Sequence, residues 1–145
     1  MNDLDRAIEI ALDAHEDQTD KAGTTYIRHP LRLMQQMETE QTRISAVLHD
    51  VVEDSDHSLS DIESEFNTEI RNAVDGLTKR DGESYMEFID RASEHPVARR
   101  VKIADLEDNL DLTRLEELTD DVHAKQRTYH KAWKQLQNDS SVADR

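Results

Sequence analysis

The chain has 145 residues, of which 35% are hydrophobic and 35% charged, and its formal net charge is −15 at pH 7. This length suits one domain with a buried core and is short for two. The sequence has no basic stripe and no apolar run of membrane-spanning length, so we expect neither duplex nucleic acid nor a membrane as a partner.

The composition also bears on the cellular setting. Asp outnumbers Glu by 19 to 14, and Arg outnumbers Lys by 12 to 6. Adaptation to high salt would explain this excess, because solvated carboxylates keep a protein soluble there, but an ordinary acidic cytosolic protein fits equally well. The chain has no cysteine and its first residues are unlike a signal peptide, so we expect a cytoplasmic location.

Apolar residues recur at helical spacing along almost the whole chain, which predicts an all-α fold. In chain order, helices are expected at 2–16, from Pro30, from a cap at Thr42 through Val51, from a capping box of Ser60 and Glu63, at 68–79, from a cap at Ser84, from Pro96, and from Thr119. A loop is expected at 17–28. We expect a single domain over 1–137 and a polar C-terminal tail over 138–145.

One predicted helical segment, SAVLHDVVEDSD (45–56), carries a histidine and four carboxylates among its apolar residues. An imidazole nitrogen and carboxylate oxygens, as in His49 and Asp50, suit a divalent first-row metal. On a helix, Glu53 and Asp54 lie one turn further on, close enough to handle the protons of a metal-bound water. The alternative is a solvated acidic helix end, because charge runs are usually exposed.

Two other segments offer further ligands for such a metal. His29 precedes the second predicted helix, although a histidine beside proline is also common as a cap. Lys102, Asp105 and Asn109 form one stripe on a later helix, where a carboxylate near the core needs a partner or a metal, although a surface Lys–Asp pair is equally expected in isolation. The resulting four-ligand set is His29, His49, Asp50 and Asp105.

The order of these motifs resembles the RelA/SpoT-type HD-domain hydrolases, and in particular the small single-domain alarmone hydrolases similar to the metazoan SpoT homologue. The matching motifs are His15 to Gln18, Lys21, Gly23, YIRHP (26–30), LHDVVED (48–54), Phe66 with VDGLTK (74–79), and VKIADLEDN (101–109). The resemblance covers roughly residues 1–115. It implies an all-α HD-domain helical bundle that binds Mn²⁺, or another divalent first-row metal, and removes the 3′-pyrophosphate of guanosine tetra- and pentaphosphate (ppGpp and pppGpp).

The resemblance also implies roles for individual residues. The metal ligands would be His29, His49, Asp50 and Asp105. Glu53 and Asp54 fall on the catalytic acidic pair, with the division between base and acid left open. Lys21 and Asn109 fall on substrate-contacting positions, and Lys79 and Lys102 are further cations that would offset negative charge.

The sequence departs from the family pattern mainly beside the substrate. Asp20 and Asp111 stand at usually basic positions, Asp17 replaces a glycine, Thr25 replaces a proline, and Leu106-Glu107-Asp108-Asn109 replaces Arg-Leu-His-Asn. Reversed charges weaken the binding of a polyphosphate unless other cations compensate. Candidates to compensate are Arg28, Lys79, Arg80, Arg99 and Arg100.

These departures keep other functions open. The substrate could be an adenosine alarmone or NADPH, the domain could bind a metal and sense a nucleotide without turnover, or the chain could be a purely structural acidic bundle without metal. The sequence does not determine the oligomeric state.

Overall fold

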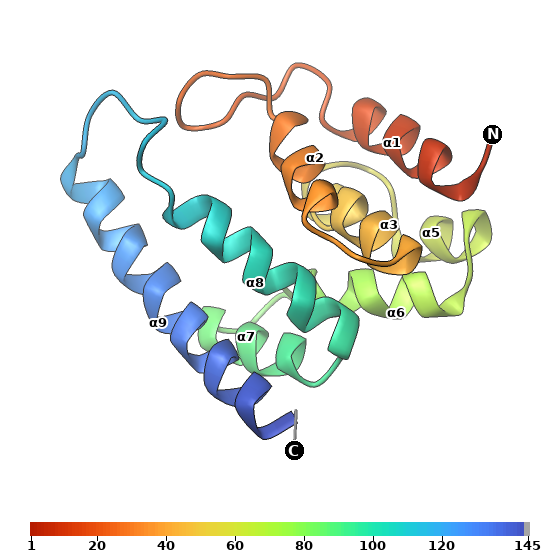
Figure 1. Ribbon diagram of the computed structural model, residues 1–145. Coiled ribbons are helices and arrows are strands. Elements are labelled where there is room, and N and C mark those ends of the chain that lie inside the picture. Colours follow the sequence, from red (N-terminus) through yellow and green to blue (C-terminus); the bar gives the residue numbers. More distant parts are fainter. Residues whose placement is uncertain (144–145) are drawn as a thin grey trace.

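Two central helices, α3 and α8, organise the structure, a computed structural model that describes the backbone of residues 1–143 and the side chains of residues 1–138 (Figure 1). The helices are α1 (Asp3–Ala14), α2 (Arg28–Gln35), α3 (Glu40–Leu48), α4 (Val51–Asp54), α5 (Leu59–Glu65), α6 (Thr68–Gly76), α7 (Tyr85–Ser93), α8 (Pro96–Leu110) and α9 (Asp120–Ala143). Within residues 1–143 the only β-structure is an isolated antiparallel bridge between Thr19 and Thr25. The all-α prediction is confirmed.

Helix α3 is central because it is buried on more than one side. Its Ile44, Val47 and Leu48 pack in a core cluster with α1, α5 and α6, whereas its Ala46 packs with residues of α2 and α8. Helix α8 likewise contributes to two clusters, and its Leu106 packs with residues of α7 and α9. Helices enclosed in this way show little amphipathic contrast, and their position fixes where their polar residues lie.

Several predicted helix starts are confirmed and two are wrong. Ser84 caps α7 in a capping box with Glu87, and Pro96 lies in the first turn of α8. The third helix is capped by Thr39 rather than Thr42, which instead occupies the third helical position of a Thr39 capping box. Helix α5 is capped by Ser58 with Asp61 rather than by Ser60 with Glu63. In each case an earlier hydroxyl satisfies the free N–H groups of the first turn.

The predicted continuous helix through residue 51 is interrupted. Helix α3 ends at Leu48, and the one-turn helix α4 begins at Val51. Between them, the backbone N–H of His49 points to the Ala46 carbonyl at 3.4 Å instead of making a regular helical bond. His49 and Glu53 therefore do not lie on one face of a single helix, as the spacing predicted.

Helix α9 runs along α8 and closes the side of the bundle formed by α7 and α8 (Figure 1). Its Ala132 and Leu136 are fully buried against Ile89 and Leu106. The helix continues to Ala143, through most of the predicted tail 138–145, whose last two residues lie outside the described part of the chain. Among the described residues, no helix combines the length and the apolar character needed to cross a bilayer.

Gly76 marks a close approach between α6 and α8. A Cβ atom at this position would lie 2.9 Å from the Cβ of Ala98, closer than two methyl groups pack. The absence of a side chain at residue 76 thus allows α6 to lie directly against α8.

We expect Gly76→Ala to lower the free energy of unfolding by about 1–3 kcal/mol, because it overpacks this contact. The measurement is urea denaturation of the wild type, both single variants and Gly76→Ala/Ala98→Gly. The double variant removes the clash, so its loss should be smaller than the sum of the two single losses by more than about 0.5 kcal/mol. Additive losses would contradict this account of the contact.

Candidate metal centre

Two histidines and two aspartates meet where α2, α8 and the α3–α4 junction come together. The ligand atoms of His29, His49 and Asp105 all lie within 4.8 Å of one another, and the three residues are buried. Asp105 Oδ1 is 2.8 Å from Nε2 of His29 and 3.5 Å from Nε2 of His49. Asp50 joins from the α3–α4 junction, with its Oδ2 3.0 Å from Nε2 of His49. The structure therefore brings together three residues of the predicted ligand set, His29, His49 and Asp105, and places the fourth, Asp50, against His49.

The tautomer of His49 leaves one nitrogen available for a metal. The Nδ1–H group donates to the Ala46 carbonyl oxygen at 2.8 Å, so the lone pair lies on Nε2 in the neutral ring. Nε2 is buried and has no hydrogen-bond partner among the described residues, although it faces Asp50 and Asp105. A buried lone pair aimed at two carboxylates fits a divalent cation with nitrogen and oxygen ligands.

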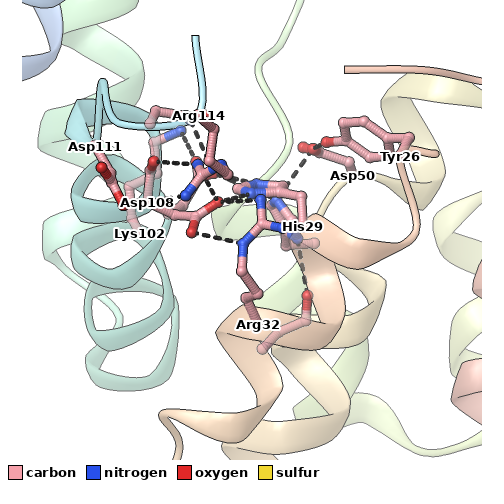
Figure 2. A network of polar contacts seen from close by, with 12 residues as sticks. Tyr26, His29, Arg32, Asp50, Lys102, Asp108, Asp111 and Arg114 are labelled. Atoms are coloured by element: carbon pink, nitrogen blue, oxygen red, sulfur yellow. Dashed lines mark hydrogen bonds and ion pairs between the residues drawn. The ribbon is translucent and has the colours of Figure 1, made fainter. Parts of the chain in front are cut away.

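The electrostatics of the cluster reflect dense, opposed charges. Burial lowers the pKa of His49, but the facing carboxylates of Asp50 and Asp105 raise it well above its usual value. Burial raises the pKa of Asp50, but the charge of His49 outweighs this effect and lowers the pKa to about 2. The hydroxyl of Tyr26 also donates to Oδ2 of Asp50 (Figure 2). Burial also raises the pKa of Asp105, but the charge of Lys102 and the bonds to the histidines lower it well below its usual value, so both carboxylates are held ionised, as metal ligation requires.

Two further predicted residues contact Asp105 on α8. Nζ of Lys102 donates to Oδ2 of Asp105 at 2.8 Å, and Nδ2 of Asn109 donates to Oδ1 at 3.2 Å. Burial lowers the pKa of Lys102, but the charge of Asp105 raises it above the usual value. The predicted stripe of these three residues on one helix face is therefore present, and Lys102 and Asn109 both donate to the carboxylate of Asp105.

A cavity of about 380 Å³ opens above the cluster and has a floor that includes His29, Asp50 and Asp105. Its walls include Lys21, Tyr85, Lys102, Asn109, Arg114 and Tyr129. Nζ of Lys21 lies 5.2 Å from the centre of the Tyr129 ring, a cation–π distance that holds this lysine at the cavity wall. The cavity thus combines aromatic surface, cations and the candidate metal ligands.

Besides the buried His49, three predicted site residues do not line this cavity. Lys79 is exposed, and its backbone N–H donates to Oε1 of Glu53 at 2.5 Å. Asp54 borders a separate cavity with Asp13 and His57. Burial raises the pKa of both Glu53 and Asp54, and the nearby charge of Asp50 raises both further. Glu53 and Asp54 therefore lie within electrostatic reach of the cluster but outside the wall of the cavity above it.

The two acidic residues at usually basic positions are satisfied by local donors. Oδ1 of Asp20 accepts the backbone N–H groups of Ala22 and Thr24, both at 2.9 Å. Asp111 accepts the backbone N–H and hydroxyl of Thr113 through Oδ1 and Nη1 of Arg114 through Oδ2. Donors that satisfy a carboxylate reduce the repulsion that it exerts on an anionic ligand. The reversed charges are therefore less unfavourable to a phosphate than their positions alone suggest.

A network around Asp108 is absent from the sequence prediction (Figure 2). Oδ2 of Asp108 is 2.6 Å from Nδ1 of His29, and both carboxylate oxygens accept bonds from Arg32 at 2.9 Å. Nη2 of Arg114 donates to the Asp108 carbonyl oxygen at 2.9 Å. The only sequence signal is spacing, since Arg32 follows His29 by three residues and Asp108 follows Asp105 by three. Neither arginine is among the predicted compensating cations.

Comparison with known proteins relates the chain to one family. The family model described as HD domain matches residues 7–108. A guanosine-3′,5′-bis(diphosphate) 3′-pyrophosphohydrolase of Aquifex aeolicus is 31% identical over 120 residues, which cover 74% of this chain and 17% of that protein. A probable GTP pyrophosphokinase of Mycobacterium leprae is 32% identical over 115 residues, covering 70% of this chain and 15% of that protein. The chain thus spans less than a fifth of the length of these curated relatives.

A solved structure has a similar fold. It is described as a metazoan orthologue of SpoT that hydrolyses ppGpp and plays a role in starvation responses, and it superposes with a TM-score of 0.78 at 24% sequence identity. The match covers 94% of this chain and 85% of that one. The expected HD-type helical bundle is confirmed by these comparisons, as is the resemblance to RelA/SpoT-type proteins.

We expect a divalent metal such as Mn²⁺ to stabilise the protein through this cluster. At 100 times its Kd, a metal that binds only the folded state adds about 2.7 kcal/mol, or about 5–10 °C in Tm for a domain of this size. His49→Ala should abolish most of that shift, as measured by thermal unfolding with and without Mn²⁺. The control is His57→Gln, because His57 pairs with Asp13 away from the cluster; an equal loss in both variants would contradict the assignment.

Proposed function

The chain belongs to the HD-domain family, and from this membership and the geometry of its site we propose that it is a metal-dependent hydrolase of a phosphorylated nucleotide. The proposed substrate is ppGpp or pppGpp, and the proposed reaction removes the 3′-pyrophosphate as pyrophosphate. The names of the relatives support this substrate, since they include a 3′-pyrophosphohydrolase of guanosine bis(diphosphate). Such a substrate would be met in the cytoplasm.

The observation that carries the proposal is the unpartnered Nε2 of buried His49, which faces carboxylates below an open cavity. We propose His29, His49, Asp50 and Asp105 as the ligands of Mn²⁺. When bound, such a metal supplies a water of lowered pKa and polarises a phosphoryl oxygen. Lys102 donates to Oδ2 of Asp105 and so keeps this ligand ionised and oriented.

The cavity walls supply contacts for a nucleotide. Lys21, held over the Tyr129 ring, and Arg114 carry positive charge toward the phosphates, and Asn109 offers an amide beside them. The hydroxyl of Tyr85 is buried and has no partner among the described residues, so it is free to bond the base or ribose. Lys79, exposed beside Glu53, is proposed to approach the phosphates from the cavity edge.

Glu53 and Asp54 are proposed to handle the protons of the reaction. The backbone N–H of Lys79 occupies Oε1 of Glu53, which leaves Oε2 to hold a proton. Burial raises the pKa of both carboxyl groups, which favours proton transfer nearer neutral pH. The division between base and acid stays open.

A nucleotide sensor without turnover is the second candidate function. The observation that favours it is that neither Glu53 nor Asp54 lines the cavity above the ligand cluster. In such a protein the metal and the cations would bind the nucleotide, while no carboxyl group would deprotonate the water.

Turnover of a nucleotide panel with Mn²⁺ tests the proposed function. The panel contains ppGpp, pppGpp, their adenosine analogues and NADPH, each measured at low and at high salt for release of pyrophosphate and phosphate. We expect pyrophosphate from ppGpp and pppGpp and no release after chelation of the metal. Binding of ppGpp without product would support the sensor, and phosphate release from NADPH alone would overturn the proposed substrate.

Glu53→Gln tests the proposed proton transfer. We expect kcat to fall by about 100-fold or more, because general acid–base catalysis contributes about 10²–10⁴-fold, while the bound metal per chain stays unchanged. The matched control is Glu38→Gln, which removes an exposed carboxylate in the α2–α3 loop. Wild-type turnover in Glu53→Gln would show that this carboxylate is not the proton carrier.

A further inference from the structure

Asp108 is a buried residue whose carboxylate contacts His29, one of the candidate metal ligands. Its side chain is 6% exposed, and its Oδ2 lies 2.6 Å from Nδ1 of His29. The other ring nitrogen, Nε2, faces Asp105 at 2.8 Å, on the side of the ligand cluster. His29 therefore lies between two carboxylates from α8, Asp105 at the metal centre and Asp108 on the opposite edge of the ring.

We propose that Asp108 is a positioning residue of the metal centre, which holds the ring of His29 in the orientation and tautomer that a metal needs. Nδ1 lies 2.6 Å from Oδ2 of Asp108, so a proton on Nδ1 would bond this carboxylate and leave the lone pair of the neutral ring on Nε2. A histidine ligand oriented by a carboxylate on its other nitrogen binds its metal more tightly and in one geometry. This inference rests on the metal centre of the proposed function.

Two arginines make a carboxylate stable at this buried position. Nε and Nη2 of Arg32 donate to Oδ1 and Oδ2 of Asp108, both at 2.9 Å, in a bidentate pair. Nη2 of Arg114 lies 3.4 Å from Oδ2 and also donates to the Asp108 carbonyl oxygen. A buried charge without such partners costs several kcal/mol. The guanidinium groups thus occupy the remaining lone pairs, and the Asp108 carboxylate stays fixed against His29.

The contacts among His29, Arg32, Asp105 and Asp108 join residues one turn apart on each of two helices. His29 and Arg32 lie on one face of α2, and Asp105 and Asp108 lie on one face of α8. Because these faces cross, Asp105 meets Nε2 of His29 while Asp108 meets both Nδ1 and the guanidinium group of Arg32. The same contacts that hold α2 against α8 therefore orient the histidine.

The test compares Asp108→Ala and Asp108→Asn with the wild type by Mn²⁺ titration. Outer partners of ligating histidines are typically worth 10–100-fold in metal affinity, so we expect about 100-fold weaker binding for Asp108→Ala and about 10-fold for Asp108→Asn, whose amide oxygen still accepts from Nδ1. The control is Asp111→Asn, which changes a carboxylate of the same cavity that also contacts Arg114 but not His29. It should bind Mn²⁺ like the wild type.

Nitrogen NMR of His29 in the Zn²⁺-loaded proteins separates positioning from a structural role. We expect a protonated Nδ1 with a slowly exchanging hydrogen in the wild type, in Asp111→Asn and, less protected, in Asp108→Asn. Asp108→Ala should lose this protection. A merely structural contribution would weaken metal binding without changing the tautomer or the exchange of this hydrogen.

Each failure is distinguishable from the others. If the wild type binds no divalent metal, the proposed function and its metal centre fall. If the wild type binds Mn²⁺ and Asp108→Ala binds it equally, the positioning role of Asp108 alone is overturned. Should Asp108→Ala fail to fold, Asp108→Asn decides, and wild-type affinity in that variant overturns the proposal.

Discussion

A buried carboxylate, Asp105, is the group on which the arrangement of this protein depends. It is 5% exposed and contacts Lys102, Asn109, His29 and His49, so that one side chain links α8 to α2 and to the end of α3. A charge in the protein interior is costly unless donors surround it. Here those donors come from several elements, and the packing of α2 and α3 against α8 is the condition that brings them together. The helix packing that forms the fold therefore also assembles the candidate site.

The irregular backbone at His49 helps to orient its side chain toward the candidate site. A regular helix through residues 49–52 would use the Ser45 carbonyl for the His49 amide, whereas here the chain turns at Ala46 and the imidazole Nδ1–H donates to the same carbonyl. The ring is then fixed with Nε2 toward Asp50 and Asp105. Helix α4, which carries Glu53, begins at Val51, and Glu53 does not line the cavity.

The carboxylates around the cavity are balanced by local hydrogen-bond donors and cations. Each carboxylate around the cavity has a specific partner: backbone N–H groups for Asp20, Thr113 and Arg114 for Asp111, and Arg32 for Asp108. Paired carboxylates neutralise and position the cations beside them instead of repelling an anion outright. A cavity lined by five aspartates and four lysines or arginines can thus still accept a phosphorylated ligand when a metal adds positive charge.

The sequence by itself determined most of the helices, the cap of α7 at Ser84, and the types of residue that meet at the cluster. Burial periodicity and capping are local properties, so the sequence reveals them. His49 and Asp50 are adjacent, and Lys102, Asp105 and Asn109 lie within two turns of one helix, so each group is also visible in the sequence. Only the tertiary structure decided that Asp108 pairs with His29 and Arg32, more than 70 residues away, and that Glu53 and Asp54 lie off the cavity wall. Periodicity shows which face of a helix is buried, but the packing of α2 against α8 selects the side chains that meet. Periodicity also does not reveal that the helix is broken at residues 49 and 50, just before Glu53 and Asp54.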